Sequence, residues 1–296
     1  MKNFFKVVDI EDVWDRRGLF PVVDQETLPL ASTVGRVLSE AVIADLDIPG
    51  FARSTMDGYA LQGATTFGAT ESNPGYLTVV GSVAMGERPD LRVGPGEAVR
   101  IATGGMLPPG ADAVMMIEHT EVLDDTTIEI YKSVAPGQHV VAQGEDVARG
   151  NTLLAGGQPV RPQEAGLLAA LGCETVHVFR KPRIGIISTG DEVVPVTAVP
   201  GPGQIRDVNS TTLSAMTTAA GGQPNVYGIV QDSLALLETT CTRALAENDM
   251  VLVSGGSSVG MRDFTIEAFE AQEDAHIMVH GVSISPGKPT ILARSG

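Results

Sequence analysis

The chain has 296 residues, more than one domain usually holds, so its length predicts two or three domains. Hydrophobic residues make up 43% of it and aromatic residues only 4%, so the cores are expected to be aliphatic. The formal net charge of −16 argues against non-specific binding to nucleic acid or to an anionic membrane. An anionic substrate would therefore need help from helix termini, a metal ion or single Lys and Arg residues.

Neither a secretory signal nor a membrane span is visible in the sequence. No apolar stretch reaches the length of a membrane span, and the first twenty residues alternate charge with short apolar runs. The two cysteines, Cys173 and Cys241, lack the spacing of metal ligands and lie in apolar, helix-like segments. We therefore expect reduced core cysteines in a cytoplasmic protein.

The first half of the chain predicts a helix followed by a small all-β unit. Leu30, Val34 and Leu38 recur at helical spacing and predict a helix within residues 22–38, with Ser32 or Thr33 as its cap. From about 48 to 142, short alternating runs are separated by Gly and Pro turns, as in an all-β unit. These runs are YLTVVGSV (76–83), EAVRI (97–101), DAVMMIE (112–118) and TIEIYKS (127–133).

The second half predicts helices and a parallel sheet. VRPQEAGLLAALGC (160–173) reads as a helix with Pro162 in its first turn and Gly172 beyond its end. After it, strands alternate with helices, which indicates a parallel sheet with right-handed crossovers. Asn209 or Ser210 is expected to cap the first of these helices. The expected order is strand 184–187, helix 210–220, strand 225–230, helix 233–246, strand 250–253 and helix 263–271.

Two stretches of this second half are built alike: RIGIISTGDEVV (183–194) and DMVLVSGGSSVGMRDF (249–264). Each is an apolar run that ends in small and hydroxyl residues followed by a carboxylate. Glycines allow backbone N–H groups to approach an anion, and ligands of parallel sheets bind at the carboxyl ends of the strands. Carboxylates among anion-binding groups indicate a divalent cation. The pair therefore predicts a phosphate and metal site.

Several of these residues also have a purely structural interpretation. Asp207 and Asp263 could be ordinary residues at helix starts, where a negative charge is favourable. Asp57, in FARSTMDGYAL (51–61), could be bonded to its own backbone in a tight turn. Lys288, in ISPGKPTIL, could be a solvated turn residue or a phosphate contact. His119 has no partner at metal-ligand spacing.

The chain contains, in this order, the motifs STMDGYA, IATGGMLPPGADAV, GEDVARG, STGDEVV, IRDVNS, SGGSSVGMRDF and SPGKP. These seven motifs and their order resemble the molybdopterin molybdenumtransferase family, of the gephyrin E-domain type, and the resemblance spans the chain. It implies a role in molybdenum cofactor biosynthesis, in which molybdate is inserted into adenylylated molybdopterin with release of AMP in a step that requires Mg²⁺. It also implies a homodimer in which one subunit's second domain lies beside the partner's third.

The resemblance also implies a multidomain fold of the α/β plus β class. Residues 1–50 and 143–180 would form a discontinuous first domain, 51–142 a small inserted β domain, and 181–296 a doubly wound parallel-sheet domain that binds molybdopterin. The family continues past this point into a fourth, β-rich domain. The chain is therefore expected to be C-terminally truncated and to bind ligand without turning over.

The family's functional residues map onto three groups of positions. The catalytic group comprises Asp57, Thr103, Glu192, Asp207, Asp263 and Lys288. The ligand-binding group comprises Ser188, Thr189, Gly190, Asn209, Ser254, Gly255, Gly256, Ser257, Gly260 and Pro286. The residues expected to hold Mg²⁺ are Glu118, Asp146, Asp191, Asp207 and Asp263.

Two other functions are compatible with the sequence. The related molybdopterin adenylyltransferase shares the third-domain fold, but it does not need the first 180 residues, which carry motifs of their own; that enzyme is also a candidate partner. A binding or scaffold protein is the alternative from another class. The sequence does not separate molybdate from tungstate, because the two oxyanions have nearly the same size and charge.

Overall fold

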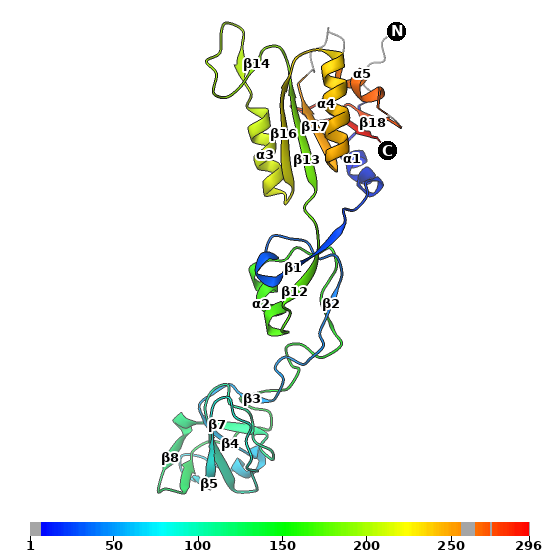
Figure 1. Cartoon of the computed structure of the whole chain (residues 1–296). Helices are drawn as coiled ribbons and strands as arrows, with labels where there is room; N and C mark the ends of the chain where they lie inside the picture. The colour runs from blue at the N-terminus through cyan, green and yellow to red at the C-terminus, as the bar shows by residue number, and fades with distance from the viewer. Residues whose placement is uncertain (1–6, 256–263, 273, 296) are drawn as a thin grey trace. The chain divides into compact units, whose positions relative to one another are not determined.

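The computed structural model describes residues 7–255, 264–272 and 274–295 (Figure 1). The chain divides into two compact units. We call one the parallel-sheet unit; it holds the described residues of 1–28, 33–39 and 177–296. The other, the β-rich unit, holds 29–32 and 40–176. A finer division into three domains stays a prediction.

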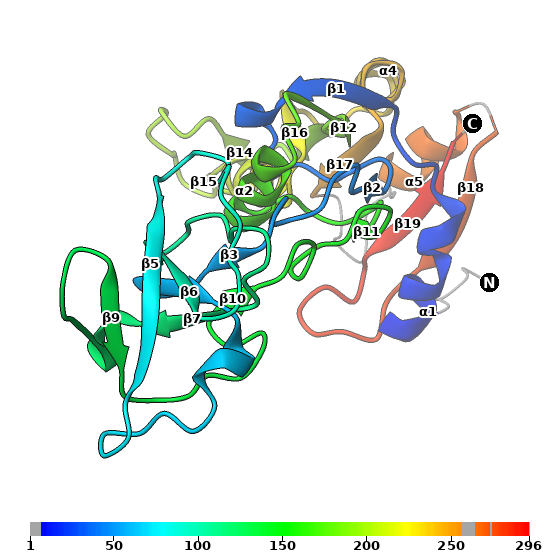
Figure 2. The same cartoon turned by 90° about the horizontal axis from the view of Figure 1, so that it is seen from below.

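The β-rich unit contains a six-stranded sheet in the order β7-β4-β6-β5-β9-β8. All neighbouring strands are antiparallel except β5 and β6, which are parallel and lie side by side in Figure 2. The four alternating runs of the sequence each form one of these strands, as predicted. The strands are β4 (Gly58–Leu61), β5 (Gly75–Val83), β6 (Glu97–Ile101), β7 (Ala113–Met116), β8 (Thr120–Val122) and β9 (Thr127–Ile130).

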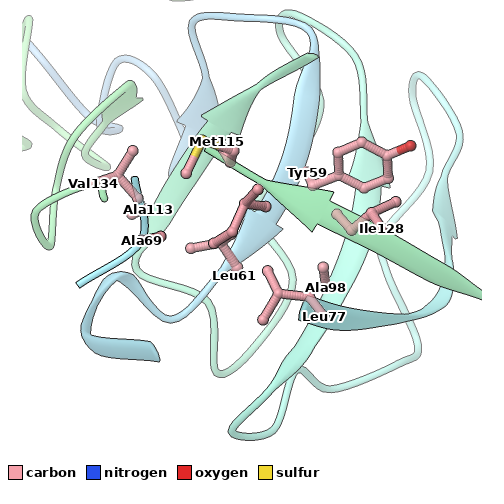
Figure 3. Packing of buried hydrophobic residues seen from close by; sticks show 10 residues of the cluster. Tyr59, Leu61, Ala69, Leu77, Ala98, Ala113, Met115, Ile128 and Val134 are labelled. Carbon is pink, nitrogen blue, oxygen red and sulfur yellow. The ribbon is translucent and has the colours of Figure 1, made fainter. Parts of the chain in front are cut away.

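The core of this sheet is small and mostly aliphatic (Figure 3). Leu61, Met115 and Ile130 are fully buried, and Tyr59 is the aromatic member of the cluster. All four residues of β4 are buried because the strand lies between β6 and β7 and is covered on both faces. This burial fixes the start of β4, where the predicted site residue Asp57 lies.

Shorter elements complete the β-rich unit. The helix α2 has Pro162 in its first turn and ends before Gly172, as predicted. The Glu164 side chain accepts a hydrogen bond from the backbone N–H of Arg161 and so caps the helix start. The elements are η2 (Leu30–Ser32), β2 (Val42–Ile43), β3 (Arg53–Ser54), η3 (Gly63–Thr66), η4 (Ile117–His119), β10 (Val140–Val141), β11 (Thr152–Leu154) and α2 (Pro162–Ala170).

The parallel-sheet unit is built on three parallel strands in the order β16-β13-β17. The adjacent residues Ile186 and Ile187 of β13 are both fully buried, so both faces of the central strand are covered. Ile187 packs with Leu237 and Cys241 of α4. The predicted alternation of strands and helices is confirmed: β13 (Arg183–Thr189), α3 (Asn209–Ala219), β16 (Gln223–Val230), α4 (Leu234–Glu247), β17 (Met250–Ser254) and α5 (Phe264–Glu270).

Several small elements accompany this sheet. β18 and β19 form an antiparallel pair, while β14 and β15 pair in parallel. β1 and β12 form a two-stranded sheet. Among the residues described, no helix is long and apolar enough to cross a membrane. These elements are α1 (Ile10–Asp15), η1 (Arg16–Leu19), β1 (Gln25–Pro29), β12 (Thr175–Phe179), β14 (Val193–Val194), β15 (Ile205–Arg206), β18 (His276–His280) and β19 (Ile291–Arg294).

The predicted helix within 22–38 is wrong. The segment instead contains β1, a short 3₁₀ turn and an isolated bridge from Leu38 to Val178. Leu38 is 1% exposed but Val34 is 50% exposed, so the two do not share a buried helical face. Gly35 adopts the left-handed conformation (φ 81°), which ends a turn rather than continuing a helix.

The prediction for the cap of α3 is also wrong. Asn209 and Ser210 lie in the first turn of the helix rather than before it. The side chain of Asp207 accepts the backbone N–H of Ser210 at 3.0 Å. A carboxylate one residue before the N-cap position has therefore taken the capping hydrogen bond.

Candidate ligand-binding cleft

The two similar loops meet at adjacent strand ends. Ser188, near the end of β13, lies opposite Ser254, the last residue of β17. The Thr189 hydroxyl donates to the backbone carbonyl of Ser254 at 3.3 Å. A side chain at Gly255 would place its Cβ 2.3 Å from the carbonyl oxygen of Thr189, so the loops touch through a position that only glycine fits.

Polar groups are buried where the loops meet. Ser188 is 2% exposed and Thr189 is 4% exposed. Within the described part of the chain, the buried Oγ of Ser254 has no hydrogen-bond partner. Buried hydroxyls are normally satisfied, and an orphaned one at a strand end is a group that a ligand or water can take.

Asp207 is the buried carboxylate of this site. Burial raises the pKa of Asp207, but hydrogen bonds from Ser210, Ser188 and the backbone of Asn209 outweigh it and leave the pKa below its ordinary value. Asp207 is therefore ionised at neutral pH although it is only 7% exposed. A buried, hydrogen-bonded negative charge beside strand ends is suited to a cation.

Asp207 and Asp191 line one cleft of about 580 Å³. Asp191 Oδ1 accepts the backbone N–H of Asp232 at 3.1 Å, which holds its carboxylate at the end of β16. The other lining residues are Gly190, Val193, Val194, Pro195, Val196, Gln204, Ser210, Thr211, Gly228, Ile229 and Gln231. One part of the cleft is therefore lined by the carboxylates of Asp191 and Asp207, which we call the carboxylate corner. Another part is lined by apolar side chains, which we call the apolar wall.

The carboxylates present fit Mg²⁺ only in part. Within the described ranges, no three His, Cys, Asp or Glu side chains gather closely enough to hold a metal ion. Mg²⁺ is commonly held by one or two carboxylates, with phosphate oxygens and water as the remaining ligands. Asp191 and Asp207 meet that requirement, and Asp263 lies outside the described residues.

A second cluster lies in the β-rich unit. The backbone N–H and the hydroxyl of Thr103 both donate to Asp57 Oδ1, at 2.7 and 2.9 Å. The pairing of Gly58 with Ile101 brings the end of β6 beside the start of β4, which makes this contact possible. These two hydrogen bonds lower the pKa of Asp57. Asp57 is therefore bonded to Thr103 rather than closing its own turn.

The other predicted metal ligands of the β-rich unit lie outside this cluster. Glu118 is an exposed residue of η4 and lines a cavity of about 270 Å³ with Glu71, His119, Tyr131 and Lys132. Asp146 is exposed, and its backbone N–H donates to the carbonyl of Ile48 at 3.0 Å. Neither carboxylate contacts the Asp57–Thr103 pair through a hydrogen bond in the described part of the chain.

The remaining predicted residues of the parallel-sheet unit are more exposed. Glu192 is exposed, with its carboxylate beside the backbone of Gly190. Pro286 and Lys288 lie in the exposed turn between β18 and β19. The backbone carbonyl of Lys288 accepts from Val282 at 3.0 Å. The predicted residues Gly256, Ser257, Gly260 and Asp263 lie outside the described residues.

The sequence reasoning missed the apolar part of the cleft. Val193 to Val196, Gln204, Gly228 and Gln231 were not among the predicted residues, although they line the same space as Asp207. The available signal was the loop VPVTAVPGPGQ (194–204) between the motifs STGDEVV and IRDVNS. Its prolines and valines are stiff, apolar residues beside two motifs that carry carboxylates.

The fold and the cleft define a protein of two compact units, one of them a parallel-sheet unit with a cleft at its strand ends. The family model described as "MoeA N-terminal region (domain I and II)" matches residues 8–172. A second, described as "Probable molybdopterin binding domain", matches residues 185–296. The chain belongs to the MoeA family.

Named relatives and solved structures agree with this membership. The molybdopterin molybdenumtransferases of Nostoc sp. and Bacillus subtilis are 36% and 34% identical to it, over 91% and 92% of the chain. The chain spans only 62% and 64% of the length of these two relatives. A crystal structure of the molybdopterin biosynthesis moeA protein from Pyrococcus horikosii is 37% identical with a TM-score of 0.80, covering 98% of this chain and 72% of that one.

Proposed function

We propose that this chain acts in molybdenum cofactor biosynthesis, as a molybdopterin molybdenumtransferase that inserts molybdate into adenylylated molybdopterin and releases AMP. The observation that carries the proposal is the cleft at the ends of β13 and β16, which is lined by the ionised carboxylate of Asp207 and by the side chain of Asp191. Family membership and the molybdenumtransferase relatives support it. The match over residues 8–172 favours it over an adenylyltransferase, which needs no such region.

Residues of the cleft, and predicted site residues outside its lining, have distinct roles in this proposal. Asp207 and Asp191 would hold Mg²⁺, which would neutralise the phosphates of the adenylylated substrate; Asp263, which lies outside the described residues, is the third ligand that the sequence predicts. The Ser254 hydroxyl, which has no hydrogen-bond partner among the described residues, and the backbone at Gly255 would bind phosphate oxygens. Lys288 would add a positive charge near the oxyanion or the leaving AMP.

We also propose that the three parallel strands are the centre of a doubly wound molybdopterin-binding domain that functions in a homodimer. The Asp57–Thr103 pair lies in the β-rich unit and the carboxylate cleft in the parallel-sheet unit. Two copies would each supply the Asp57 cluster to the partner's cleft. The arrangement of domains in the resembling family supports this part.

Calorimetric titration of AMP with and without Mg²⁺ tests the proposal. The parent chain should bind AMP more tightly when Mg²⁺ is present. In Asp207→Asn, the amide oxygen can still accept the Ser210 N–H, but the charge is lost. We expect Mg²⁺-supported AMP binding to weaken about tenfold or more, because the cation loses a charged ligand.

An exposed carboxylate in the turn between β8 and β9 provides the control, since Asp125→Asn should bind like the parent. If Asp207→Asn keeps the full effect of Mg²⁺, then Asp207 only caps α3. AMP release from adenylylated molybdopterin and molybdate is the second measurement. In a form of the protein that spans the full length of the molybdenumtransferase relatives, binding without any release would favour the alternative of a molybdopterin-binding or scaffold protein.

A further inference from the structure

The loop of residues 195–204 forms one wall of the cleft and is fixed at both ends. It connects β14 to β15, and Val194 lies directly opposite Arg206 in that parallel pair. The backbone N–H of Asp207 donates to the carbonyl of Val194 at 2.9 Å. The loop therefore leaves and returns beside the buried carboxylate of the site.

The Arg206 side chain donates hydrogen bonds to backbone carbonyls of this loop. Its Nε–H lies 3.1 Å from the carbonyl oxygen of Val196 and 3.1 Å from that of Ala198, so one donor is shared between two acceptors. The Gln204 side chain accepts the backbone N–H of Gly201 at 3.0 Å and closes the far end. Arg206 itself is exposed, so its charge stays in water while its Nε fixes the path of the loop.

The wall that Arg206 holds is apolar. Val193, Val194, Pro195 and Val196 all line the cleft. Gly228 of β16 lines it too, with φ 86° and no atom within 4 Å of the place where a Cβ would be. The cleft therefore combines a stiff apolar surface with a backbone that carries no side chain, and the carboxylates Asp191 and Asp207 lie along the same space.

We propose that this wall binds the planar heteroaromatic ring of the ligand, and that Arg206 is the positioning residue that holds the wall in place. The proposal rests on the proposed function, whose substrate carries two such rings, an adenine and a pterin. A flat ring buries apolar area against Val and Pro side chains that lose little rotamer freedom on binding. Its phosphate would then extend to the carboxylate corner.

Three probes and one matched pair of variants test the wall. The probes, each titrated in the presence of Mg²⁺, are AMP, neopterin and ribose 5-phosphate, which lacks a planar ring. Val196 lines the cleft and is 57% exposed, whereas Val199 of the same loop does not line it and is 88% exposed. Val196→Ser should weaken binding of AMP or neopterin about fivefold and leave ribose 5-phosphate unchanged. Val199→Ser should leave all three probes unchanged.

The positioning role of Arg206 is tested by whether its substitution weakens the binding of ring-bearing probes but not the binding of ribose 5-phosphate. Arg206→Ala should weaken the same ring-bearing probe about as much as Val196→Ser, with ribose 5-phosphate unchanged within about twofold. Arg206→Lys should recover part of that loss, because its ammonium group can still donate to a loop carbonyl. Equal weakening of all three probes by Arg206→Ala, together with a lower melting temperature, would mean a merely structural role and would overturn the assignment of Arg206.

The outcomes separate this inference from the proposed function. If AMP alone responds to Val196→Ser, the bound ring is the adenine; if neopterin alone responds, it is the pterin, and either result supports the proposal. If the parent binds AMP with Mg²⁺ but Val196→Ser and Arg206→Ala bind every probe as the parent does, the inference is wrong and the proposed function stands. If the parent binds none of the probes, both are wrong.

Discussion

At the scale of single residues, Gly255 decides whether the strand ends of β13 and β17 can touch. Its backbone has φ 115°, and a Cβ there would lie 2.3 Å from the Thr189 carbonyl oxygen and 2.5 Å from its hydroxyl. Both groups belong to the buried strand end of β13, which cannot retreat without disturbing the central strand. The second loop therefore approaches the first only because residue 255 has no side chain.

We predict that Gly255→Ala weakens AMP binding about tenfold or more, because the second loop must move away from Thr189. Gly221→Ala is the matched control, since Gly221 also has a positive φ (87°) but no atom within 4 Å of its Cβ position. Both substitutions strain the backbone, but only Gly255→Ala also brings a Cβ against Thr189. The difference in AMP affinity between the two variants, measured by calorimetry, therefore reports the effect of that steric clash. Equal binding by the two variants would contradict the prediction.

The residue types of the site could be predicted from sequence, but their partners could not. Motif order points to Asp57, Thr103 and Asp207. That Thr103 donates twice to Asp57 depends on the pairing of β4 with β6, which no local pattern specifies. Asp207 stays ionised although it is buried because Ser210, Ser188 and the backbone of Asn209 donate hydrogen bonds to it, and of these only Ser188 is distant in sequence. The carboxylates of the site can therefore be identified from local sequence, whereas the hydrogen bonds that set their pKa values come partly from residues distant in sequence.

At the scale of elements, an ion-pair cluster ties the chain entering β13 to the start of β17. Both Nη atoms of Arg180 lie 2.6 Å from the Asp249 carboxylate, and the backbone N–H of Arg183 donates to it at 2.7 Å. The Arg180 guanidinium, together with Arg183, lowers the pKa of Asp249 to about 2 against the cost of burial. A bidentate pair of this kind fixes the relative orientation of the two side chains as well as the distance between them.

This cluster predicts a pH-dependent stability. The folded pKa of Asp249 lies below its ordinary value of 3.8, so its contribution is complete well above pH 4 and is lost as the pH falls through about 2. We expect Asp249→Asn to destabilise the chain by about 1 kcal/mol at pH 7, after allowing for solvent screening. The difference should fall to about half by pH 3.

Urea unfolding of the parent and of Asp249→Asn between pH 7 and pH 3 provides the measurement. Asp125→Asn serves as the control, because Asp125 is an exposed residue in the turn between β8 and β9. A difference between parent and Asp249→Asn that stays constant over this range would show that the charge of Asp249 does not stabilise the fold.

Helices and strands with a clear hydrophobic periodicity could be predicted from sequence. Elements held by pairing with residues distant in sequence could not. The strands and helices from β13 to α5 occur where the alternation predicts them, because each buried run is long enough to show its period. The spacing of Leu30 and Leu38 imitates a helix, yet β1 is held by pairing with β12 and Leu38 by a bridge to Val178. Three apolar residues over nine positions cannot distinguish a helix from a strand followed by an isolated bridge.

At the scale of the whole molecule, the two polar clusters lie in different compact units. Asp57 belongs to the β-rich unit and Asp207 to the parallel-sheet unit. In the proposed homodimer, each working site takes Asp57 from one copy and Asp207 from the other. An isologous dimer then contains two equivalent sites, and each substitution made in both copies removes one group from both of them.

Mixed dimers test this sharing. Homodimers of Asp57→Asn and of Asp207→Asn should each release almost no AMP from adenylylated molybdopterin, measured in a form of the protein that turns over its substrate. A dimer with one copy of each variant carries both defects in one site and none in the other, so about half of the parental rate should return. Two affinity tags, one on each variant, isolate this mixed dimer, and a tagged parental dimer sets the full rate. Mixed dimers as inactive as either homodimer would place both residues in the site of a single chain, because no complete site could then form.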